Sequence, residues 1–345
     1  MARSKKENRE YIALKNDIRD SSLKNLYLFY GEERYLLEYY LGEIRKIILS
    51  DGLSEFNYKK LDGKSLSISQ LREAVDSPPF FSERTLVEVD DFDIFRSTED
   101  IKKELIDIFS DLPEYVCLIF VYDTVEYKPD GRVKINSELK KHIEAVEFEG
   151  QEQNDLINWI GRRFKALDKQ IDRATADYLI FVSGGLMTKL VTEIEKVAAY
   201  SQKRDVTRED IDAVVIPVID AVTYKLTNAI IDRRFDSAVA ILSDLLAMRE
   251  PPHRIIYSVS LKIRQLYSAW ICLDCGKGMS DLMDMFDIRN DFQARGLMTG
   301  ARKAGEKWCK DALKMCTETA AKLNSSSVDN EELLSQLIVN LAVIE

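Results

Sequence analysis

A short aromatic-rich run, Leu26–Tyr30, ends at Gly31 and is followed by an amphipathic stretch at residues 35–48. The run predicts a buried strand, and the stretch predicts a helix with one apolar face. Nucleotide-binding α/β proteins place their phosphate loop where a strand ends in glycine and leads into a helix. The pattern therefore predicts an α/β domain and makes nucleotide binding the first function to test.

The alternation of strand-like and helical segments continues along the first part of the chain. Further strand-like runs lie at residues 56–61, 85–89, 117–122 and 145–148. Helical stretches lie between them, at residues 67–74, 99–109 and 136–143. Strands that alternate with helices indicate a parallel sheet covered on both faces. We expect this α/β domain to span residues 1–149.

The residues that a phosphate loop needs are absent from this position. The functional pattern is Gly-x4-Gly-Lys-Ser/Thr, in which backbone amides and the lysine hold the phosphates. When its first glycine is aligned on Gly31, the later positions are taken by Leu36, Leu37 and Glu38. The two glutamates directly after Gly31 would also repel a triphosphate. The sequence thus predicts a degenerate, non-binding nucleotide site, with no cofactor and no metal. Asp90 and Asp91, at the end of another predicted strand, are read as turn residues.

The β pattern disappears from about residue 152. Asn154 is expected to cap a first helix, and Gly184-Gly185 separates two more. Thr207 begins a capping-box-like start to another helix. These signals predict a small helical domain at residues 150–216.

The last part of the chain, residues 217–345, is helical throughout by pattern. Apolar residues recur there at helical spacing in several stripes. The first stripe consists of Phe235, Val239, Leu242 and Leu246. A second stripe runs from Ile256 to Trp270, and others lie near Trp308 and near Leu334. Regular stripes of this kind indicate bundle packing, within the chain or against neighbouring subunits.

Charge and hydropathy exclude several classes of protein. The chain of 345 residues carries a net charge of −10, and its five cysteines suit a reducing cytoplasm. Residues 1–150 hold 23 basic and 31 acidic side chains, whereas residues 221–345 hold 16 of each. Bulk attraction to nucleic acid is therefore not expected, because phosphate neutralisation needs clustered cations. No apolar run approaches the roughly 20 residues that span a bilayer. The polar N-terminal residues do not resemble a signal peptide.

No constellation of residues predicts catalysis. Cys272 and Cys275, together with Cys309 and Cys316, could be arranged as a four-thiolate zinc site, but free helical cysteines fit their helical spacing better. The two histidines lie near no nucleophile pattern, and we read both as surface or cap residues.

Two modest basic clusters leave two interpretations open. One comprises Arg162, Arg163, Lys165 and Lys169, predicted on one helix, and the other lies at residues 302–310. Each is either a solvated helix face or a minor phosphate contact within an assembly.

The adjacent aromatics Phe80 and Phe81 follow a predicted helix and two prolines. They either pack in the core against the next strand or form an exposed hydrophobic plug for a partner, since buried aromatics anchor interfaces. The residues alone favour the core.

The chain resembles the delta-subunit family of bacterial DNA polymerase III over most of its length. The resemblance is carried by residues 30–37 (Tyr-Gly-Glu-Glu-Arg-Tyr-Leu-Leu) and 76–87 (Asp-Ser-Pro-Pro-Phe-Phe-Ser-Glu-Arg-Thr-Leu-Val). It continues through residues 185–196, 206–211 and 264–267 (Arg-Gln-Leu-Tyr) and the closing helices. The order and spacing of these segments together are specific.

The resemblance implies an AAA+ (P-loop-like) architecture that has lost ATP binding. The expected fold is an α/β domain with a degenerate nucleotide site, a small helical lid-like domain and an all-α collar domain for oligomerisation. No active site of its own is expected, although the chain would be a subunit of the DNA polymerase III holoenzyme, a DNA-directed polymerase.

The same resemblance reverses the interpretation of the two aromatics. It implies that Phe80 first, and Phe81 second, contact the sliding clamp, with Pro79 shaping the turn. Pro79 stands where some members of the family have an aliphatic residue.

The implied function is to bind and open the sliding clamp (beta subunit) so that it can be loaded on primer-template DNA in the cytoplasm. The implied partners are the ATP-binding tau/gamma subunits and the delta-prime subunit, with Arg162, Arg163 and Lys165 as possible DNA contacts and no membrane. Two alternatives stay open at this point: an AAA+-like ATPase with an unrecognised phosphate site, and a DNA-binding repair factor.

Overall fold

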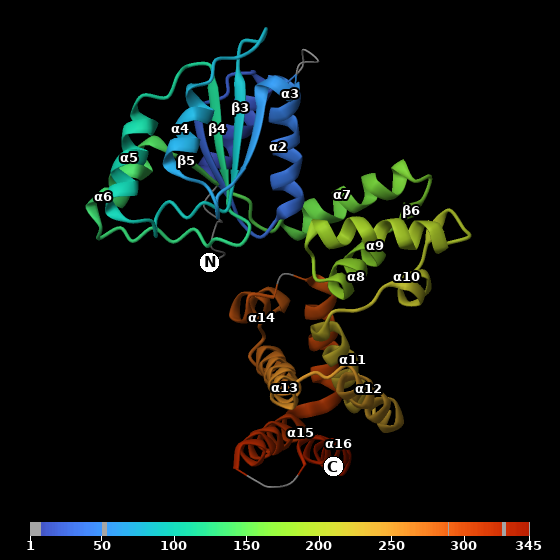
Figure 1. The fold of residues 1–345 in the computed structure, drawn as a ribbon. Coiled ribbons are helices and arrows are strands. Elements are labelled where there is room, and N and C mark those ends of the chain that lie inside the picture. Colours follow the sequence, from blue (N-terminus) through green and yellow to red (C-terminus); the bar gives the residue numbers. More distant parts are fainter. Residues whose placement is uncertain (1–7, 50–53, 289, 326–328, 345) are drawn as a thin grey trace. The chain divides into compact units, whose positions relative to one another are not determined.

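The computed structural model describes residues 8–49, 54–288, 290–325 and 329–344 (Figure 1). The chain divides into two compact units. The first extends to Gln151 and includes Leu186–Thr188, and the second takes the remaining residues from Glu152 onward.

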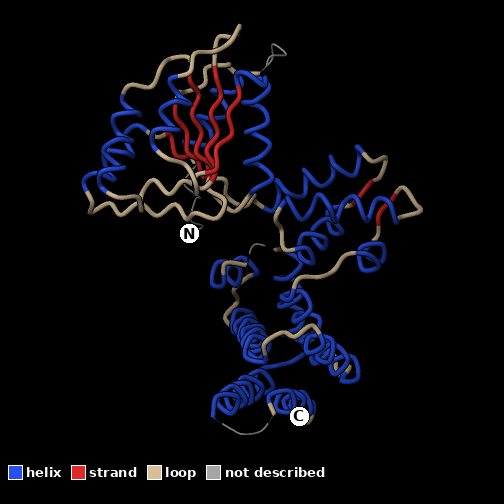
Figure 2. Tube along the Cα trace, in the orientation of Figure 1, coloured by secondary structure: helices blue, strands red, loops and turns tan. Residues whose placement is uncertain are grey.

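A parallel sheet forms the centre of the first unit, and its strands stand together in red in Figure 2. Its strand order is β2-β3-β4-β1-β5, and all neighbouring strands are parallel. The strands are β1 (Leu26–Tyr30), β2 (Tyr58–Asp62), β3 (Thr85–Asp90), β4 (Val116–Val121) and β5 (Glu144–Glu147). The helices between and before them are α1 (Arg9–Arg19), α2 (Arg34–Ile48), α3 (Ser54–Asn57), α4 (Ile68–Asp76), α5 (Glu99–Ser110) and α6 (Lys134–His142). The predicted parallel α/β sheet is confirmed.

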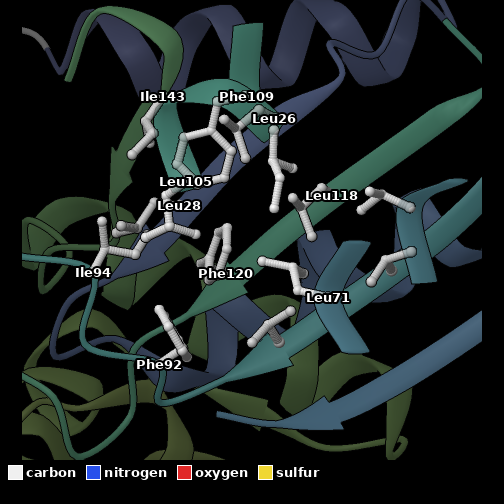
Figure 3. Packing of buried hydrophobic residues seen from close by; sticks show 14 of the residues in the cluster. Leu26, Leu28, Leu71, Phe92, Ile94, Leu105, Phe109, Leu118, Phe120 and Ile143 are labelled. Carbon is white, nitrogen blue, oxygen red and sulfur yellow. The ribbon is translucent and has the colours of Figure 1, made fainter. Parts of the chain in front are cut away.

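Both faces of the sheet are buried, as its apolar strands predict. Leu26 and Leu28 of β1 point to one face and pack with side chains of α4, α5 and α6 (Figure 3). Tyr27 and Phe29 point to the other face and pack with α1 and α2. Successive side chains of a strand alternate between faces, so one five-residue strand contributes to two cores.

The parallel arrangement separates the domain's two candidate sites. The turn after β1, where a phosphate loop would lie, is at the carboxyl edge of the sheet. By contrast, α3 leads into β2, and residues 77–84 lead into β3, so both lie at the amino edge (Figure 1). Because β2 and β3 are neighbours, these two connections are brought together.

The second unit is mainly helical. Its first elements are α7 (Gln153–Ala166), β6 (Gln170–Ile171), α8 (Arg173–Ser183), α9 (Met187–Tyr200), β7 (Asp205–Val206) and α10 (Arg208–Val214). Its remaining helices are α11 (Ile219–Ile231), α12 (Phe235–Ala247), α13 (Pro252–Asp274), α14 (Met279–Phe286), α15 (Asp291–Ser325) and α16 (Asn330–Ala342). The long α15 is broken at Gly305, whose φ is +73°.

Apolar side chains of α11, α12, α13, α15 and α16 form one core, and α13, α14 and α15 form a second. The predicted stripe on α12 is partly wrong, because Leu242 is buried but Val239 is 45% exposed. Ala238 and Leu245 take the inward positions instead. Among the described residues no single helix is long and apolar enough to cross a membrane, although α10 and α11 together, across a sharp bend, meet the same length and composition test.

Three local predictions are corrected. The run at 56–61 is not all strand, because Phe56 and Asn57 belong to α3 and β2 starts at Tyr58. The N-cap of α7 is Glu152, not Asn154. The β signal does not end at residue 152, since β6 and β7 pair in parallel. The capping box of Thr207 with Asp210 is confirmed. The domain boundaries at 149/150 and 216/217 stay predictions.

Candidate functional site

The turn after β1 is closed by main-chain contacts with the end of β5. The Phe148 amide donates to the Tyr30 carbonyl (2.7 Å), and the Phe148 carbonyl accepts from the Glu33 amide (2.9 Å). Gly31, between these bonds, has a φ of +129°, a conformation that favours glycine. The glycine is therefore required by the local backbone, whatever the turn binds.

The side chains aligned with the phosphate-loop residues face other parts of the domain. Leu37 is fully buried, and Leu36 packs against the same core as α1 and α2. Glu38 pairs with Arg34 at 3.7 Å. None of these three supplies the lysine charge or the hydroxyl that a phosphate loop uses.

The charged residues Glu33 and Arg34 of this turn are buried in, or bonded to, other parts of the same domain. Glu33 is fully buried, and its burial raises the pKa of the carboxyl group. The Arg34 guanidinium donates to the Tyr122 carbonyl (3.2 Å) and pairs with Asp123 (3.2 Å). Arg34 thus ties the start of α2 to the end of β4.

Asp91, at the end of β3, organises the loop after β4. Its carboxylate accepts from the amides of Asp123 and Thr124, both at 2.8 Å, and from the Thr124 hydroxyl (2.6 Å). Partial burial works to raise the pKa of Asp91, but these hydrogen bonds outweigh it and hold the pKa below its usual range. Asp90 pairs with Lys60 at 2.9 Å. Both carboxylates have partners within the domain. Asp91 lies in the turn, as predicted, whereas Asp90 is still part of β3.

Phe80 and Phe81 lie at the opposite, amino edge of the sheet and are exposed. Phe80 is 47% exposed and Phe81 is 81% exposed, while Pro79 is half-buried. The two rings meet edge to face at 4.6 Å between centroids. Phe81 has a φ of +49°, which is rare for a bulky residue and carries strain. The pair does not pack in the core of the domain.

Hydrogen bonds hold the segment that carries these aromatics. The Asn57 side chain accepts from the Phe80 amide (2.7 Å) and donates to the Phe80 carbonyl (2.9 Å). At the far end, the Arg84 guanidinium donates to the Leu23 carbonyl (2.8 Å) and the Val116 carbonyl (3.1 Å). The backbone is therefore anchored while two phenylalanine rings remain in solvent.

A third exposed aromatic, Phe56, extends the pair. It is 61% exposed, and its ring centroid lies 5.1 Å from that of Phe80. Sequence reasoning missed Phe56 and Asn57 because it placed both in a strand. The signal that could have found them is that β2 and β3 start side by side, so that the segments leading into these strands meet. This signal can be used only when the strand order is known.

The basic clusters have mixed surroundings. Arg162 and Lys165 are exposed on α7, and the Arg163 guanidinium lies 5.3 Å from the centre of the Trp159 ring. Lys169 is not on this helix, contrary to prediction: it lies beyond α7, and its amine donates to the Ser201 carbonyl at 2.6 Å.

The second cluster lies on α15. Lys303 there pairs with Asp232 (2.7 Å), and Lys310 pairs with Glu306.

The thiols form no metal site in the described part of the chain. Cys272, Cys309 and Cys316 are buried and free, and Cys275 is exposed and free. No group of three or more potential ligands that could hold a metal ion occurs among the described residues. His253 lies on the surface, with Nε2 3.1 Å from Oδ1 of Asn324.

Fold and turn chemistry together define a protein with a parallel α/β domain, in which Leu36, Leu37 and Glu38 stand at the positions that a phosphate loop would use. Comparison with known proteins then identifies the family. Residues 27–149 match the family model described as DNA polymerase III, delta subunit. Residues 220–341 match the model of the DNA polymerase III delta subunit, C-terminal domain. The chain belongs to the DNA polymerase III delta-subunit family.

Individual relatives agree with this assignment. The chain is 24% identical over 325 residues to DNA polymerase III subunit delta of Bacillus subtilis, covering 92% of each chain. It is 21% identical over 281 residues to the probable DNA polymerase III subunit delta of Aquifex aeolicus, covering 78% of this chain and 77% of the relative. Its fold is similar to the solved structure of the Bacillus subtilis DNA clamp loader delta protein. That match has a TM-score of 0.50 and 20% identity, and it covers 96% of this chain and 99% of the other.

Proposed function

We propose that the protein acts as the delta subunit of a clamp loader and binds the ring-shaped sliding clamp (beta subunit) through Phe80 and Phe81, with Pro79 shaping the turn. The observation that carries the proposal is the combination of exposed aromatics and a hydrogen-bonded backbone. Phe81 is 81% exposed, yet the adjacent Phe80 backbone is held at both its amide and its carbonyl.

This combination suits a docking element. Full burial of a phenylalanine side chain stabilises a complex by about 1.5–3 kcal/mol relative to its exposure. A segment whose backbone is already ordered loses less entropy on binding than a flexible one. Two such rings on an anchored segment therefore fit the anchor residues that dominate many interfaces.

The proposed action is to favour the open form of the clamp. A partner that binds the open ring more tightly than the closed ring shifts the equilibrium by the difference in affinity. This shift requires no hydrolysis by the delta subunit. Leu36, Leu37 and Glu38 support this view, because they replace the groups that hold a triphosphate.

The helical parts take the remaining roles in this proposal. Residues 150–216 form the lid-like domain, and residues 217–345 form the collar that joins the ATP-binding tau/gamma subunits and the delta-prime subunit. Arg162, Arg163 and Lys165 are proposed to touch primer-template DNA within the assembly. The net charge of −10 argues against tight DNA binding by the isolated chain. The expected compartment is the cytoplasm, where replication takes place.

The test is a binding measurement with the cognate sliding clamp. Phe80→Ala/Phe81→Ala is expected to weaken binding at least about 100-fold, as truncation of two anchor residues does. Tyr39→Ala is the matched control, since Tyr39 is a 50% exposed aromatic on α2 of the same domain. Equal binding by the wild type and the double variant refutes the plug, and no binding by a folded wild-type chain refutes the function.

Two rival functions make different predictions. An AAA+-like ATPase would bind a labelled ATP analogue stoichiometrically as an isolated chain. A DNA-binding repair factor would bind primed DNA alone, with strong salt dependence and no effect of changes at Phe80. We expect neither result.

A further inference from the structure

Two chain segments that lie far apart in the sequence form the surface around Phe80 and Phe81. Phe56 and Asn57 end α3, directly before β2, while Phe80 and Phe81 lie in the connection from α4 to β3. Because β2 and β3 are adjacent and parallel, their starting ends lie side by side, and α3 meets the aromatic segment there. The exposed rings of Phe56 and Phe80, 24 positions apart in the sequence, thus share one surface.

Asn57 contacts this segment through both of its amide atoms. Oδ1 accepts from the Phe80 amide at 2.7 Å, and Nδ2 donates to the Phe80 carbonyl at 2.9 Å. Asn57 is only 3% exposed, so these bonds lie out of competition with water. A side chain that bonds the donor and the acceptor of one residue restrains the position of its peptide groups.

Phe56 adds a third ring beside the proposed contact. Its ring is tilted by 41° to the Phe80 ring, at 5.1 Å between centroids. This is the range of a favourable aromatic pair. The Phe80 ring therefore contacts both the Phe56 ring and the Phe81 ring, and all three rings are substantially exposed.

The strained conformation of Phe81 makes the restraint on Phe80 consequential. A φ of +49° costs of order 1–3 kcal/mol for a bulky residue and persists only where its surroundings impose it. The Asn57 bonds to the preceding residue and the Arg84 bonds after it are such surroundings. Loss of the Asn57 bonds would remove one of these two restraints and so favour relaxation of the Phe81 backbone.

We propose that α3 completes the clamp-binding element: Asn57 is a positioning residue that sets the geometry of Phe80 and Phe81, and Phe56 is a third aromatic contact. This inference rests on the proposed function, since it takes the sliding clamp as the partner. It extends that function because the contact includes a segment separate from the aromatic dipeptide.

The first experiment measures the affinity of full-length variants for the cognate clamp. Asn57→Ala and Phe56→Ala are each expected to weaken binding about tenfold. Phe56→Tyr, which keeps the ring, is expected to bind with wild-type affinity. Asn136→Ala is the control, because Asn136 is also buried and also bonds a loop carbonyl, that of Asp130 (3.2 Å), within the same domain. Wild-type affinity of both α3 alanine variants would overturn the proposal.

The second experiment detects positioning directly, by hydrogen exchange at the Phe80 amide. Asn57→Ala removes the acceptor of this amide, so its exchange is expected to become at least about tenfold faster, while exchange in β4 is unchanged. An unchanged rate at Phe80 would refute the positioning role. If Asn57→Ala does not fold, Asn57→Asp carries the test. It keeps the acceptor for the Phe80 amide but loses the donor to the Phe80 carbonyl, so clamp binding is expected to weaken while exchange at the Phe80 amide stays slow, and wild-type affinity would refute the positioning role.

The outcomes separate this inference from the proposed function. If Phe80→Ala/Phe81→Ala loses binding and the α3 variants do not, the plug stands and the role of α3 is refuted. If the folded wild type does not bind the clamp, the proposed function fails and Phe56 loses its partner. The exchange rate at Phe80 still decides whether Asn57 orders the segment.

Discussion

Gly31 lies so close to the main chain of Phe148 that a Cβ atom at Gly31 would be 2.3 Å from the Phe148 carbonyl oxygen. The glycine at the end of β1 therefore has a reason to be there that does not involve phosphate. The turn connects β1 to α2, and main-chain atoms of Phe148 occupy the space beside its glycine.

Replacement of this glycine is expected to destabilise the α/β domain. Gly31→Ala introduces both the clash with Phe148 and a side chain at a φ of +129°, and we expect a loss of at least about 2 kcal/mol. Hydrogen exchange of the sheet amides measures the change. In the control, Gly42→Ala on α2, the added Cβ meets nothing within 4 Å, and the variant should be stabilised by about 0.5–1 kcal/mol. Equal stability of the two variants would contradict the close approach.

The lysine of a phosphate loop cannot be restored here without damage to the core. Leu37 is fully buried in the core beneath α2, so Leu37→Lys is expected to cost more than about 3 kcal/mol, because an unpaired charge is buried. Tyr39→Lys, at a 50% exposed position of the same helix, should leave unfolding nearly unchanged. Equilibrium dialysis with an ATP analogue should detect no binding by Leu37→Lys/Glu38→Thr. Stoichiometric binding would show that the turn still has room for a triphosphate.

Residue pattern is enough to predict the sheet and to identify the residues that follow Gly31 at phosphate-loop spacing. Alternation in β1 separates Leu26 and Leu28 from Tyr27 and Phe29, and the structure places these pairs in two different cores. The replaced positions of the phosphate loop are also local, because they follow Gly31 at fixed spacing. Short-range periodicity and spacing carry this information without knowledge of strand order.

The candidate docking surface depends on contacts that no local pattern contains. Asn57 and Phe80 meet only because β2 and β3 are neighbours, and a four-residue helix such as α3 has too few positions for periodicity to reveal it. The two-residue strands β6 and β7 were missed for the same reason. Val239 fits a helical stripe, but Ala238 and Leu245 show that the inward face of α12 is rotated from it.

An ion pair between a half-buried arginine and a buried carboxylate joins α2 to the sheet. The Arg45 guanidinium binds Glu88 of β3 through two hydrogen bonds of 2.7 and 2.6 Å, and the Tyr58 hydroxyl donates to the same carboxylate at 2.9 Å. Glu88 is fully buried. Arg45→Met is therefore expected to cost about 3 kcal/mol, because it leaves a buried carboxylate without its cation. Arg45→Met/Glu88→Leu should recover most of this loss.

This prediction is best measured by hydrogen exchange in β3 and β4 of the full-length chain. The three tryptophans, Trp159, Trp270 and Trp308, all lie in the second unit, so their fluorescence would not report on this domain. Arg19→Met, at the exposed pair with Asp20, is the control and should leave the exchange unchanged. A double variant as unstable as Arg45→Met would show that the loss comes from packing of the arginine and not from the uncompensated charge.

Lys262 on α13 makes the stability of the helical bundle depend on pH. Its side chain is 7% exposed, and its amine lies 5.9 Å from the centre of the Tyr224 ring. Burial lowers the pKa of Lys262 to about 8 from 10.5, and the charge of Asp220 only partly opposes this. The unfolded chain therefore holds this proton more tightly than the folded chain does. Consequently, the bundle should gain stability as the pH rises from about 8 to about 10.5.

The full gain in the free energy of unfolding from such a pKa shift is about 3 kcal/mol. The gain is complete above pH 10.5 and absent well below pH 8. Lys262→Met removes the titrating amine and fills the same volume, so it should stabilise the protein at pH 7 and flatten the pH dependence. Urea unfolding followed by tryptophan fluorescence measures the stability at pH 7 and its pH dependence, because Trp270 and Trp308 lie in helices of this unit. The decisive quantity is the difference between wild type and variant at pH 7 and pH 9.5, since other groups titrate equally in both. A difference that does not change between these pH values would show that Lys262 keeps its proton in the folded bundle.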